Sequence, residues 1–555
     1  MIRSLAVLLV LLFSTYCGSR EIHTTTYYVS AKSGNDSNSG LSPTDAFKTL
    51  GKANLLSLKP GDSLLLASNS VFEGGLSLIN IHGTKSDPVI ITSYPDNLIS
   101  DEIRPVINAK GSLQGILIEN SSFIEISNIE IIADAKSDRS YIVEETRQKR
   151  CGLMVKNTEP TALEHIYINN LYIHDIFYQV PGFKRGAKEV RTSNGTQNYG
   201  WGIYVVNGHE KAEMSDIRIA NTRIENVAHT GIKILGKHES GIRNIEIANN
   251  ELIATGGPGM MFGRVGDMHI HHNTINRSGD NSDTRKWGRG SGLWTWGSND
   301  VLIEHNRFTN ANGPGDSAGA HIDFNCSNVV LQYNFSANNA GGFCEILGNN
   351  YNCSYRYNIS VNDGFRIKGV DGAFQEGKTF WLSGYVGKGN KRNGPYNSYF
   401  YNNTIFVNED IVSKIAIAKE ASGVLISNNI FYVMGSSEYV KGDQYRPEKE
   451  GHFDSRNVIF ENNLFYSQAS WSEQIPIQDI APLFGNPEFS NPGDTDIKGY
   501  IPSNSELIKN KGIPIQLIPD DTIGLKIGLK VEKDILGNEI IDLPDMGAIE
   551  LNSIK

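Results

Sequence analysis

The chain has 555 residues, enough for a large core, and a formal net charge of −10. This charge excludes a global positive field of the kind that attracts nucleic acids, so a polyanionic partner needs a local basic patch. Glycine is frequent, at 56 residues, and turns rich in asparagine recur along the chain. A repetitive fold can reach this length as one domain.

Residues 1–17 have the layout of a signal peptide, because Arg3 precedes an apolar run that is too short to cross a bilayer comfortably. We therefore expect an exported protein, either periplasmic or anchored to the outer membrane or cell surface. Cys17, in a Cys-Gly-Ser sequence, suggests a lipoprotein signal. Tyr16 is larger than the small residue usual before a lipidated cysteine, so lipidation stays open.

Four further cysteines lie in the exported part, and export permits disulfides. Their spacing does not match a zinc site. We interpret them as small core residues, with a Cys326–Cys353 disulfide as an open alternative. The four residues are Cys151, Cys326, Cys344 and Cys353.

From Tyr27 the sequence predicts a strand, a polar turn and a short helix over about residues 47–56. A turn at Pro60 and Gly61 then precedes a strand from Ser63 to Ala67. This opening resembles the N-terminal cap of secreted right-handed parallel β-helix proteins.

A short phrase, a small residue followed by alternating side chains, recurs between residues 200 and 369. Successive side chains of a strand point to opposite faces, so the third residue after each glycine should form a buried column. That column is Val205, Ile234, Phe262, Thr295, Ile322, Cys344 and Ile367. The residues on either side of it face outward, and they make a wall that we take as the catalytic face.

A second phrase is an alternating apolar run that ends in asparagine, as in residues 245–250, 301–306 and 424–429. The intervals between copies vary while the phrase stays constant, which indicates a solenoid with loops inserted at its corners. Short strands and little helical periodicity favour a β-solenoid, and asparagine suits a stacked ladder at a tight turn.

These repeats resemble the right-handed parallel β-helix of pectate lyases and related carbohydrate-active proteins over roughly residues 60–470. The expected fold is therefore all-β: one right-handed parallel β-helix over 24–480 with an N-terminal cap. Residues 481–555 are expected to form a C-terminal cap or tail. The resemblance is specific for fold and weak for chemistry, because the same fold carries lyases, hydrolases and phage tailspikes.

Three insertions are rich in lysine and arginine although the protein is acidic overall. They span residues 177–199, 278–290 and 370–395. Long corner loops of a solenoid often wall a cleft, and solvated loops are the alternative.

Asp323 and Glu345 take equivalent places in consecutive copies of the glycine phrase, so stacking places their strands about 4.8 Å apart. Like charges at this spacing raise one pKa and leave one acid and one base at neutral pH. The spacing also suits a retaining glycosidase. A calcium site, or ion pairs with Arg366 and Lys368, are the alternatives.

Other residues of the wall complete the candidate site. His321 and Lys233 are candidate catalytic bases, and His229 lies just before another copy of the phrase. Outward tryptophans suggest a platform for sugar rings, and cations can hold a uronate carboxylate or a sulfate. The candidate substrate-binding residues are Tyr204, His229, Arg264, Arg289, Trp294, Trp296, Arg366 and Lys368.

We expect a monomer that acts on an acidic oligo- or polysaccharide and does not bind nucleic acid. The main prediction is a lyase or dehydratase that performs β-elimination on uronic acid units. The phrasing around residues 319–325 and 341–350 resembles β-helix proteins of marine polysaccharide-degrading bacteria, including those acting on ulvan-type sugars. A retaining glycoside hydrolase using Asp323 and Glu345, and a non-catalytic glycan-binding β-helix, are the alternatives. No cofactor is expected beyond the calcium alternative.

Overall fold

The computed structural model describes residues 24–95, 103–135, 149–192, 195, 198–440 and 457–551. The predicted signal peptide, residues 1–17, and the lipidation site at Cys17 lie outside the described residues. Within those described ranges, no helix is long and apolar enough to cross a membrane.

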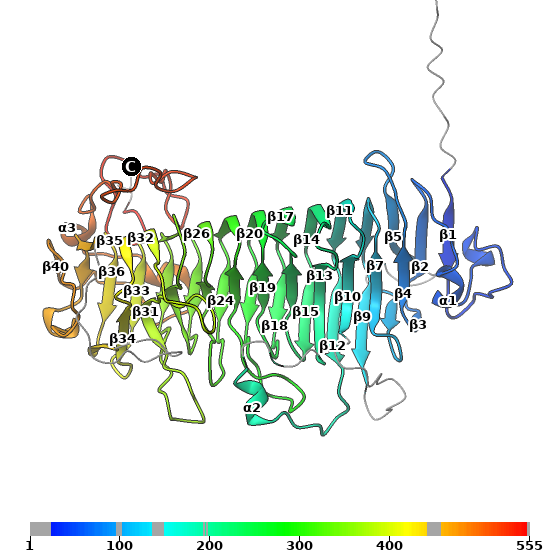
Figure 1. Cartoon of the computed structure of the whole chain (residues 1–555), viewed down its shortest axis with the longest axis horizontal. Helices are drawn as coiled ribbons and strands as arrows, with labels where there is room; N and C mark the ends of the chain where they lie inside the picture. Colours follow the sequence, from blue (N-terminus) through cyan, green and yellow to red (C-terminus); the bar gives the residue numbers. More distant parts are fainter. Residues whose placement is uncertain are drawn as a thin grey trace, which may run out of the picture.

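The chain winds into one elongated solenoid of three parallel β-sheets, which we name sheets A, B and C (Figure 1). Most turns of the solenoid add one strand to each sheet, so each strand lies beside the strand that takes the same place in the next turn. The predicted right-handed parallel β-helix is confirmed as the fold class.

Among the described residues, sheets A and B contain 14 strands each and sheet C contains 12. Sheet A contains β1 (Thr26–Val29), β2 (Ser63–Ala67), β5 (Val89–Tyr94), β8 (Ile124–Ser127), β11 (Ala162–Asn169), β14 (Glu213–Ala220), β17 (Ile242–Ala248), β20 (Val265–His271), β23 (Asn299–Glu304), β26 (Ser327–Gln332), β29 (Ser354–Arg356), β32 (Tyr396–Tyr401), β35 (Ser422–Ser427) and β38 (Val458–Glu461). Sheet B contains β3 (Val71–Glu73), β6 (Val106–Asn108), β9 (Glu130–Asp134), β12 (Tyr172–Phe177), β15 (Arg223–Val227), β18 (Glu251–Ile253), β21 (Thr274–Asn276), β24 (Arg307–Thr309), β27 (Phe335–Ala337), β30 (Ile359–Val361), β33 (Thr404–Val407), β36 (Ile430–Val433), β39 (Leu464–Phe465) and β40 (Leu483–Phe484). Sheet C contains β4 (Leu76–Ile79), β7 (Gln114–Glu119), β10 (Arg150–Asn157), β13 (Gly200–Asn207), β16 (Ile232–Leu235), β19 (Met260–Gly263), β22 (Leu293–Trp296), β25 (Ala320–Ile322), β28 (Gly342–Ile346), β31 (Lys378–Leu382), β34 (Ser413–Ile417) and β37 (Ser437–Tyr439).

The asparagine phrase builds sheet A and the corner that follows it. The side-chain amide of Asn306 donates to Asn334 Oδ1 at 3.1 Å, and that of Asn334 donates to Asn358 Oδ1 at 3.0 Å. The same contact recurs from Asn250 to Asn463, where Asp479 takes over as the acceptor. These buried amides satisfy backbone groups at the corner, which is why the sequence repeats asparagine there.

The described helices are short. The helix predicted over about residues 47–56 is present as α1 (Leu50–Ala53), with the Thr49 hydroxyl accepting from Lys52 N at 3.1 Å. α2 (Ala187–Val190) lies in the first basic insertion and α3 (Ser505–Ile508) in the C-terminal tail. The solenoid therefore owes its rigidity to stacked strands.

The C-terminal tail folds back along the side of the solenoid, as the red segment of Figure 1 shows. Ile518 and Leu525 pack on the outer face of sheet A beside Tyr399 and Tyr401. Ile535, Met546 and Ile549 pack on the outer face of sheet B. Trp471 and Ile475, which precede the C-terminal tail, pack against the interior core of the solenoid.

All four described cysteines are free and buried. Their interpretation as small buried residues is confirmed, and the alternative of a Cys326–Cys353 disulfide does not form.

Candidate active site

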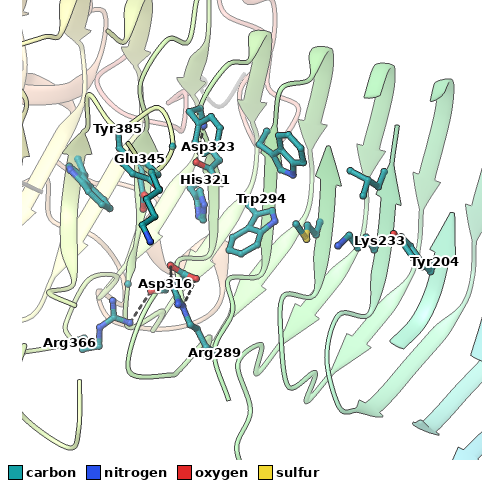
Figure 2. Close-up of a pocket in the computed structure, with 18 of the residues that line it drawn as sticks. Tyr204, Lys233, Arg289, Trp294, Asp316, His321, Asp323, Glu345, Arg366 and Tyr385 are labelled. Atoms are coloured by element: carbon teal, nitrogen blue, oxygen red, sulfur yellow. Dashed lines mark hydrogen bonds and ion pairs between the residues drawn. The ribbon is translucent and has the colours of Figure 1, made fainter. Parts of the chain in front are cut away.

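A cavity of ≈ 470 Å³ lies on the outer face of sheet C and is walled by loops from the corners. Figure 2 shows Tyr204 and Lys233 at one end of it and three carboxyl groups at the other. The lining residues are Lys149, Tyr204, Lys233, Leu235, Met261, Arg289, Trp294, Trp296, Asp316, His321, Asp323, Phe324, Gly341, Glu345, Arg366, Trp381, Tyr385, Gly387 and Lys388.

The first part of the predicted outward column is confirmed. Tyr204 pairs in register with Lys233, Lys233 with Met261, and Met261 with Trp294. Trp294 then pairs with His321. The period-two pattern of the glycine phrase thus correctly aligned five consecutive strands, β13 to β25, on the cavity side.

The predicted register is wrong at the next strand. Ile322 pairs with Ile346, and Ala318 pairs with Gly342, where the prediction paired Ile322 with Cys344. The common offset places Glu345 opposite His321, so Glu345 and Asp323 do not take equivalent positions. A shift of two residues keeps the same face outward, which is why Glu345 still reaches the cavity. The close carboxylate spacing expected of a retaining glycosidase no longer follows from strand stacking.

The strand predicted after Gly364 does not form. Gly364 has φ +88°, and Glu345 instead pairs with Trp381 of β31. Lys368 is exposed and does not line the cavity, so its predicted place in the wall is wrong. Arg366 reaches the cavity from the loop, with Nη1 donating to the carbonyls of Gly313 at 3.0 Å and Asp316 at 2.9 Å. Arg366 therefore fixes the loop that carries Asp316.

Asp323 and Glu345 both have raised pKa values. Burial raises the pKa of Asp323 to about 7, although its Oδ1 accepts from Phe324 N at 2.9 Å. Burial also raises the pKa of Glu345, which is 7% exposed, and the neighbouring Asp316 and Asp323 raise it further against the opposing effect of Lys378. Both groups thus favour the neutral acid more than an exposed carboxyl does.

Asp316, which the sequence pattern did not single out, is the third carboxyl group of the cavity. Arg289 holds it in a two-pronged ion pair, with Nε to Oδ2 at 2.8 Å and Nη2 to Oδ1 at 3.0 Å. Burial raises the pKa of Asp316, but the ion pair with Arg289 outweighs burial and holds the pKa below its ordinary value. Asp316 is therefore the ionised carboxylate of the three.

Arg289 joins two of the basic insertions to this carboxylate. Its Nη1 donates to the carbonyls of Arg191 at 3.0 Å and Thr192 at 2.9 Å, across the sequence gap between the insertions. Arg289 was predicted to bind substrate. It does line the cavity, but its contacts show that it positions Asp316.

His321 lies in the cavity between Trp294 and Glu345. It is 5% exposed, its Nδ1 is 3.3 Å from Ser291 Oγ, and burial lowers its pKa to about 4. The imidazole is therefore neutral at pH 7. Its ring meets Trp294 edge-on, with the centroids 5.5 Å apart.

The aromatic platform for sugar rings stays a prediction. Trp294 and Trp296 both line the cavity, but Trp294 is 6% exposed, so surrounding residues cover most of it. Arg264 does not line the cavity. Its guanidinium lies 5.1 Å from the centroid of the Trp296 ring, and its Nη1 donates to Lys237 O at 2.9 Å.

His229 does not line the cavity, so the structure does not bring it together with the other predicted binding residues. Its ring is stacked between Trp201 and Trp287, with centroid distances of 4.6 Å on both sides. Its Nδ1 lies 2.7 Å from Thr230 Oγ1. His229 therefore packs the second basic insertion against β13.

Lys233 lies three strands from His321 along the register and cannot serve as a base beside the carboxyl groups, as was predicted. It forms the opposite end of the cavity with Lys149 and Tyr204. The sequence pattern gave no signal for Lys149, because it precedes β10 and the copy of the glycine phrase that begins at Gly152. Trp381 was missed because the prediction took Gly364 as the start of the next copy, whereas Gly377 precedes β31 and Trp381 pairs with Glu345. Tyr385 lies beyond the end of β31.

The calcium alternative stays a prediction. In the described part of the chain, no group of three or more His, Cys, Asp or Glu side chains is arranged to hold a metal ion.

Fold and cavity together define a parallel β-helix protein with a cleft along one sheet, carboxyl groups at one end and lysines at the other. No protein-family model matches the chain. The chain is 24% identical to a lacto-N-biosidase of Bifidobacterium longum subsp. longum, over 96% of this chain and 36% of that protein. The chain thus spans about a third of the length of this curated relative.

Solved structures with similar folds include a GH136 lacto-N-biosidase from Eubacterium ramulus. It has a TM-score of 0.50 and 20% identity, over 76% of this chain and 67% of that one. The A-module of a mannuronan C-5 epimerase from Azotobacter vinelandii has a TM-score of 0.44 and 12% identity, over 77% and 91% of the two chains.

The prediction of a lyase acting by β-elimination on uronic acid units is wrong. The curated relative and the GH136 structure are lacto-N-biosidases, which are glycoside hydrolases. The predicted roles of His321 and Lys233 as catalytic bases of an elimination are therefore wrong as well.

Proposed function

We propose that this protein is a glycoside hydrolase that cleaves an oligosaccharide bound along the cleft of sheet C. The observation that carries the proposal is the pairing, at one end of the cavity, of a carboxylate held ionised and a carboxyl group with a raised pKa. Glycosidases need one group of each kind beside the scissile bond. Likeness to the lacto-N-biosidases supports the reaction class.

Asp323 is the proposed general acid. Its pKa of about 7 keeps much of the group protonated near neutral pH, and it donates its proton to the oxygen of the departing sugar. Asp316 is the proposed partner, because Arg289 keeps it ionised despite burial. Its negative charge faces the positive charge that develops on the anomeric carbon as the C–O bond breaks.

The pair of Asp323 and Glu345, predicted from the sequence, is the competing assignment. Both of these groups have raised pKa values, so neither is held ionised by a nearby cation as Asp316 is. We therefore propose that Glu345, as a neutral carboxyl, hydrogen-bonds a sugar hydroxyl. Trp294 and Trp296 supply apolar ring faces in the same cavity.

We also propose that the substrate is acidic, as the sequence predicted, and the support for this is the set of lysines that line the cavity. Arg289 and Arg366 are engaged in holding Asp316 and its loop. The remaining lysines that line the cavity are Lys149, Lys233 and Lys388. We also propose that the protein is exported, and the N-terminal apolar run supports this proposal.

The reaction is tested by incubating the protein with a panel of oligosaccharides and measuring new reducing ends. One member is an aryl glycoside of lacto-N-biose, because that disaccharide gives the relatives their name. Cleavage of any member supports hydrolysis. Binding without cleavage of any member identifies a glycan-binding β-helix and contradicts the proposal.

The roles are separated with Asp323→Asn and Asp316→Asn on two substrates that share a glycone. A dinitrophenyl leaving group needs no proton, so loss of the acid should cost far less on that glycoside than on the natural one. Loss of Asp316 should cost both substrates alike. The anomeric form of the first product shows whether Asp316 attacks directly, with retention, or through water, with inversion.

A further inference from the structure

Two lysines converge at the end of the cleft that is remote from the carboxyl groups (Figure 2 shows Lys233 beside Tyr204). Lys149 Nζ donates to the Tyr204 hydroxyl at 2.9 Å and lies 4.3 Å from the centroid of that ring. Lys233 Nζ lies 4.6 Å from the Trp201 ring centroid and 5.6 Å from that of Tyr204. Both ammonium groups therefore rest on the same two aromatic rings of β13.

Lys233 is 7% exposed and lines the cavity. Across the described ranges, no carboxylate forms an ion pair with Lys149 or Lys233. The nearby acidic groups stay neutral, because burial raises the pKa of the Cys151 thiol to about 12 and also raises the pKa of Tyr204. Two cationic side chains thus share one partly enclosed end of the cavity without a neighbouring anion.

This arrangement is costly to the free protein. Burial, and to a smaller extent the charge of Lys149, lower the pKa of Lys233 to about 7. An anion between the two amines relieves both effects, because it replaces lost hydration and compensates their mutual repulsion.

The fold does not need a lysine at this place. In the outward column of sheet C, Met154 of β10 and Met261 of β19 lie two strands before and one strand after Lys233. Both methionines are nearly buried, at 9% and 5% exposed. An unbranched apolar side chain therefore meets the packing demands of the column, and the amine of Lys233 requires another explanation.

We propose that Lys149 and Lys233 form a subsite for an anionic group of the substrate, a carboxylate or a sulfate ester on a sugar remote from the cleaved bond. The proposal rests on the proposed function, since it names the chemistry of the oligosaccharide bound in the same cleft. Trp201 and Tyr204 hold the two ammonium groups in place through their ring faces. The bound anion accepts hydrogen bonds from both amines.

The strand register sets the distance between this subsite and the carboxyl groups at the other end of the cleft. Lys233, Met261, Trp294 and His321 stand on consecutive strands, so the anion lies about 14 Å along the sheet from the carboxyl end. The subsite therefore selects which oligosaccharide binds and does not act on the reacting atoms.

The test is an array of oligosaccharide pairs whose members differ in one group. Sialylated members are paired with their asialo forms, uronate members with carboxyl-reduced forms, and sulfated members with unsulfated forms. The full chain carrying Asp323→Asn is applied, so that hydrolysis does not remove the ligands. We expect at least one acidic class to bind about 10-fold more tightly than its neutral partner, the equivalent of about 1.4 kcal/mol. The class that shows the preference identifies the anion.

Lys233→Met, added to Asp323→Asn, should abolish the preference, and Lys233→Arg should retain part of it because the charge remains. Lys237→Met is the matched control, since Lys237 lies just beyond β16 and pairs with Glu210 at 3.2 Å outside the cavity. It should leave the preference unchanged. A thermal unfolding scan checks that Lys233→Met folds, and Lys149→Met carries the test if it does not.

Equal binding of acidic and neutral members, or a preference that survives Lys233→Met, overturns the subsite. Its failure is distinct from failure of the proposed function. If the unaltered chain cleaves neutral members but shows no acidic preference, the hydrolase stands and the subsite falls. If acidic members are preferred and none is cleaved, the subsite stands and the hydrolase falls.

Discussion

The two ends of the sheet C cleft are built on the same alternating strands but manage buried charge in opposite ways. At the carboxyl end, Arg289 of the second basic insertion and Arg366 of the loop after Gly364 fix Asp316 with paired, satisfied contacts. At the lysine end, Lys149 and Lys233 rest on aromatic rings with no ion pair among the described residues. One end is organised before substrate binds, and the other gains its counter-charge from a ligand.

This difference explains why catalysis and selection are placed apart. A reacting bond needs preorganised groups whose protonation is fixed in the free enzyme. A selecting subsite discriminates best when a substrate without the matching group leaves its charges unpaired. The following predictions test each end of the comparison.

Asp323→Asn should produce the largest effect. Loss of the general acid should reduce kcat/KM on a natural oligosaccharide by about 10³-fold, because proton transfer to the leaving oxygen is lost. Steady-state kinetics measure the loss. Asn350→Ala is no suitable control, because Asn350 Nδ2 bonds the Asp323 carbonyl, whereas Lys237→Met alters only the surface. Retention of more than a tenth of the activity contradicts the assignment.

Asp316→Asn and Glu345→Gln should separate the two candidate pairs. Asp316→Asn should cost about 10²-fold or more on natural and aryl substrates alike, since the amide no longer stabilises the developing positive charge. Glu345→Gln should cost about 10-fold, the loss of one neutral hydrogen bond to substrate. The reverse order would assign catalysis to Asp323 and Glu345.

The pH profile of kcat/KM should fall on both sides of its optimum, and each fall should report the pKa of one carboxyl group. The acid must be protonated, so activity should fall about tenfold per pH unit above about pH 7, where Asp323 ionises. The Asp316 pKa is lowered, so the acidic limb should lie below the ordinary aspartate range. Arg289→Lys should move only the acidic limb, to higher pH, because the two-pronged ion pair is lost. An unmoved acidic limb contradicts the role of Arg289.

Substitution of Lys233 should give the smallest effect, and the effect should appear in KM rather than in kcat. For an acidic oligosaccharide, Lys233→Met should raise KM about 10-fold while kcat changes little, because the group binds far from the reacting bond. In the unaltered chain, KM for the acidic substrate should rise above about pH 7, as free Lys233 loses its proton. A change in kcat equal to that in KM would move Lys233 into the reacting centre.

Sequence periodicity predicted the interior of the solenoid and much of the cleft. The glycine phrase correctly aligned Tyr204, Lys233, Trp294 and His321, because a strand period of two leaves one choice of face when one side is buried. It failed where corner loops replace regular stacking. Phe343 shows this, since it packs in the core against Phe308 and Tyr355 although the pattern placed it outward.

What the sequence determined by itself is the parallel β-helix, the asparagine ladder and the face of sheet C that carries reactive side chains. These depend on repeats of local pattern, and each repeat buries its apolar side chains only by stacking on its neighbours. Tertiary structure alone decided which carboxyl groups meet and in which protonation state. Asp316 and Arg289 belong to different corner loops, outside the alternating strands β22 and β25, so the strand pattern did not single out their contact. Their two-pronged contact, the burial of Asp323 and the meeting of Lys149 with Lys233 exist only once the coils are stacked and the insertions folded over them.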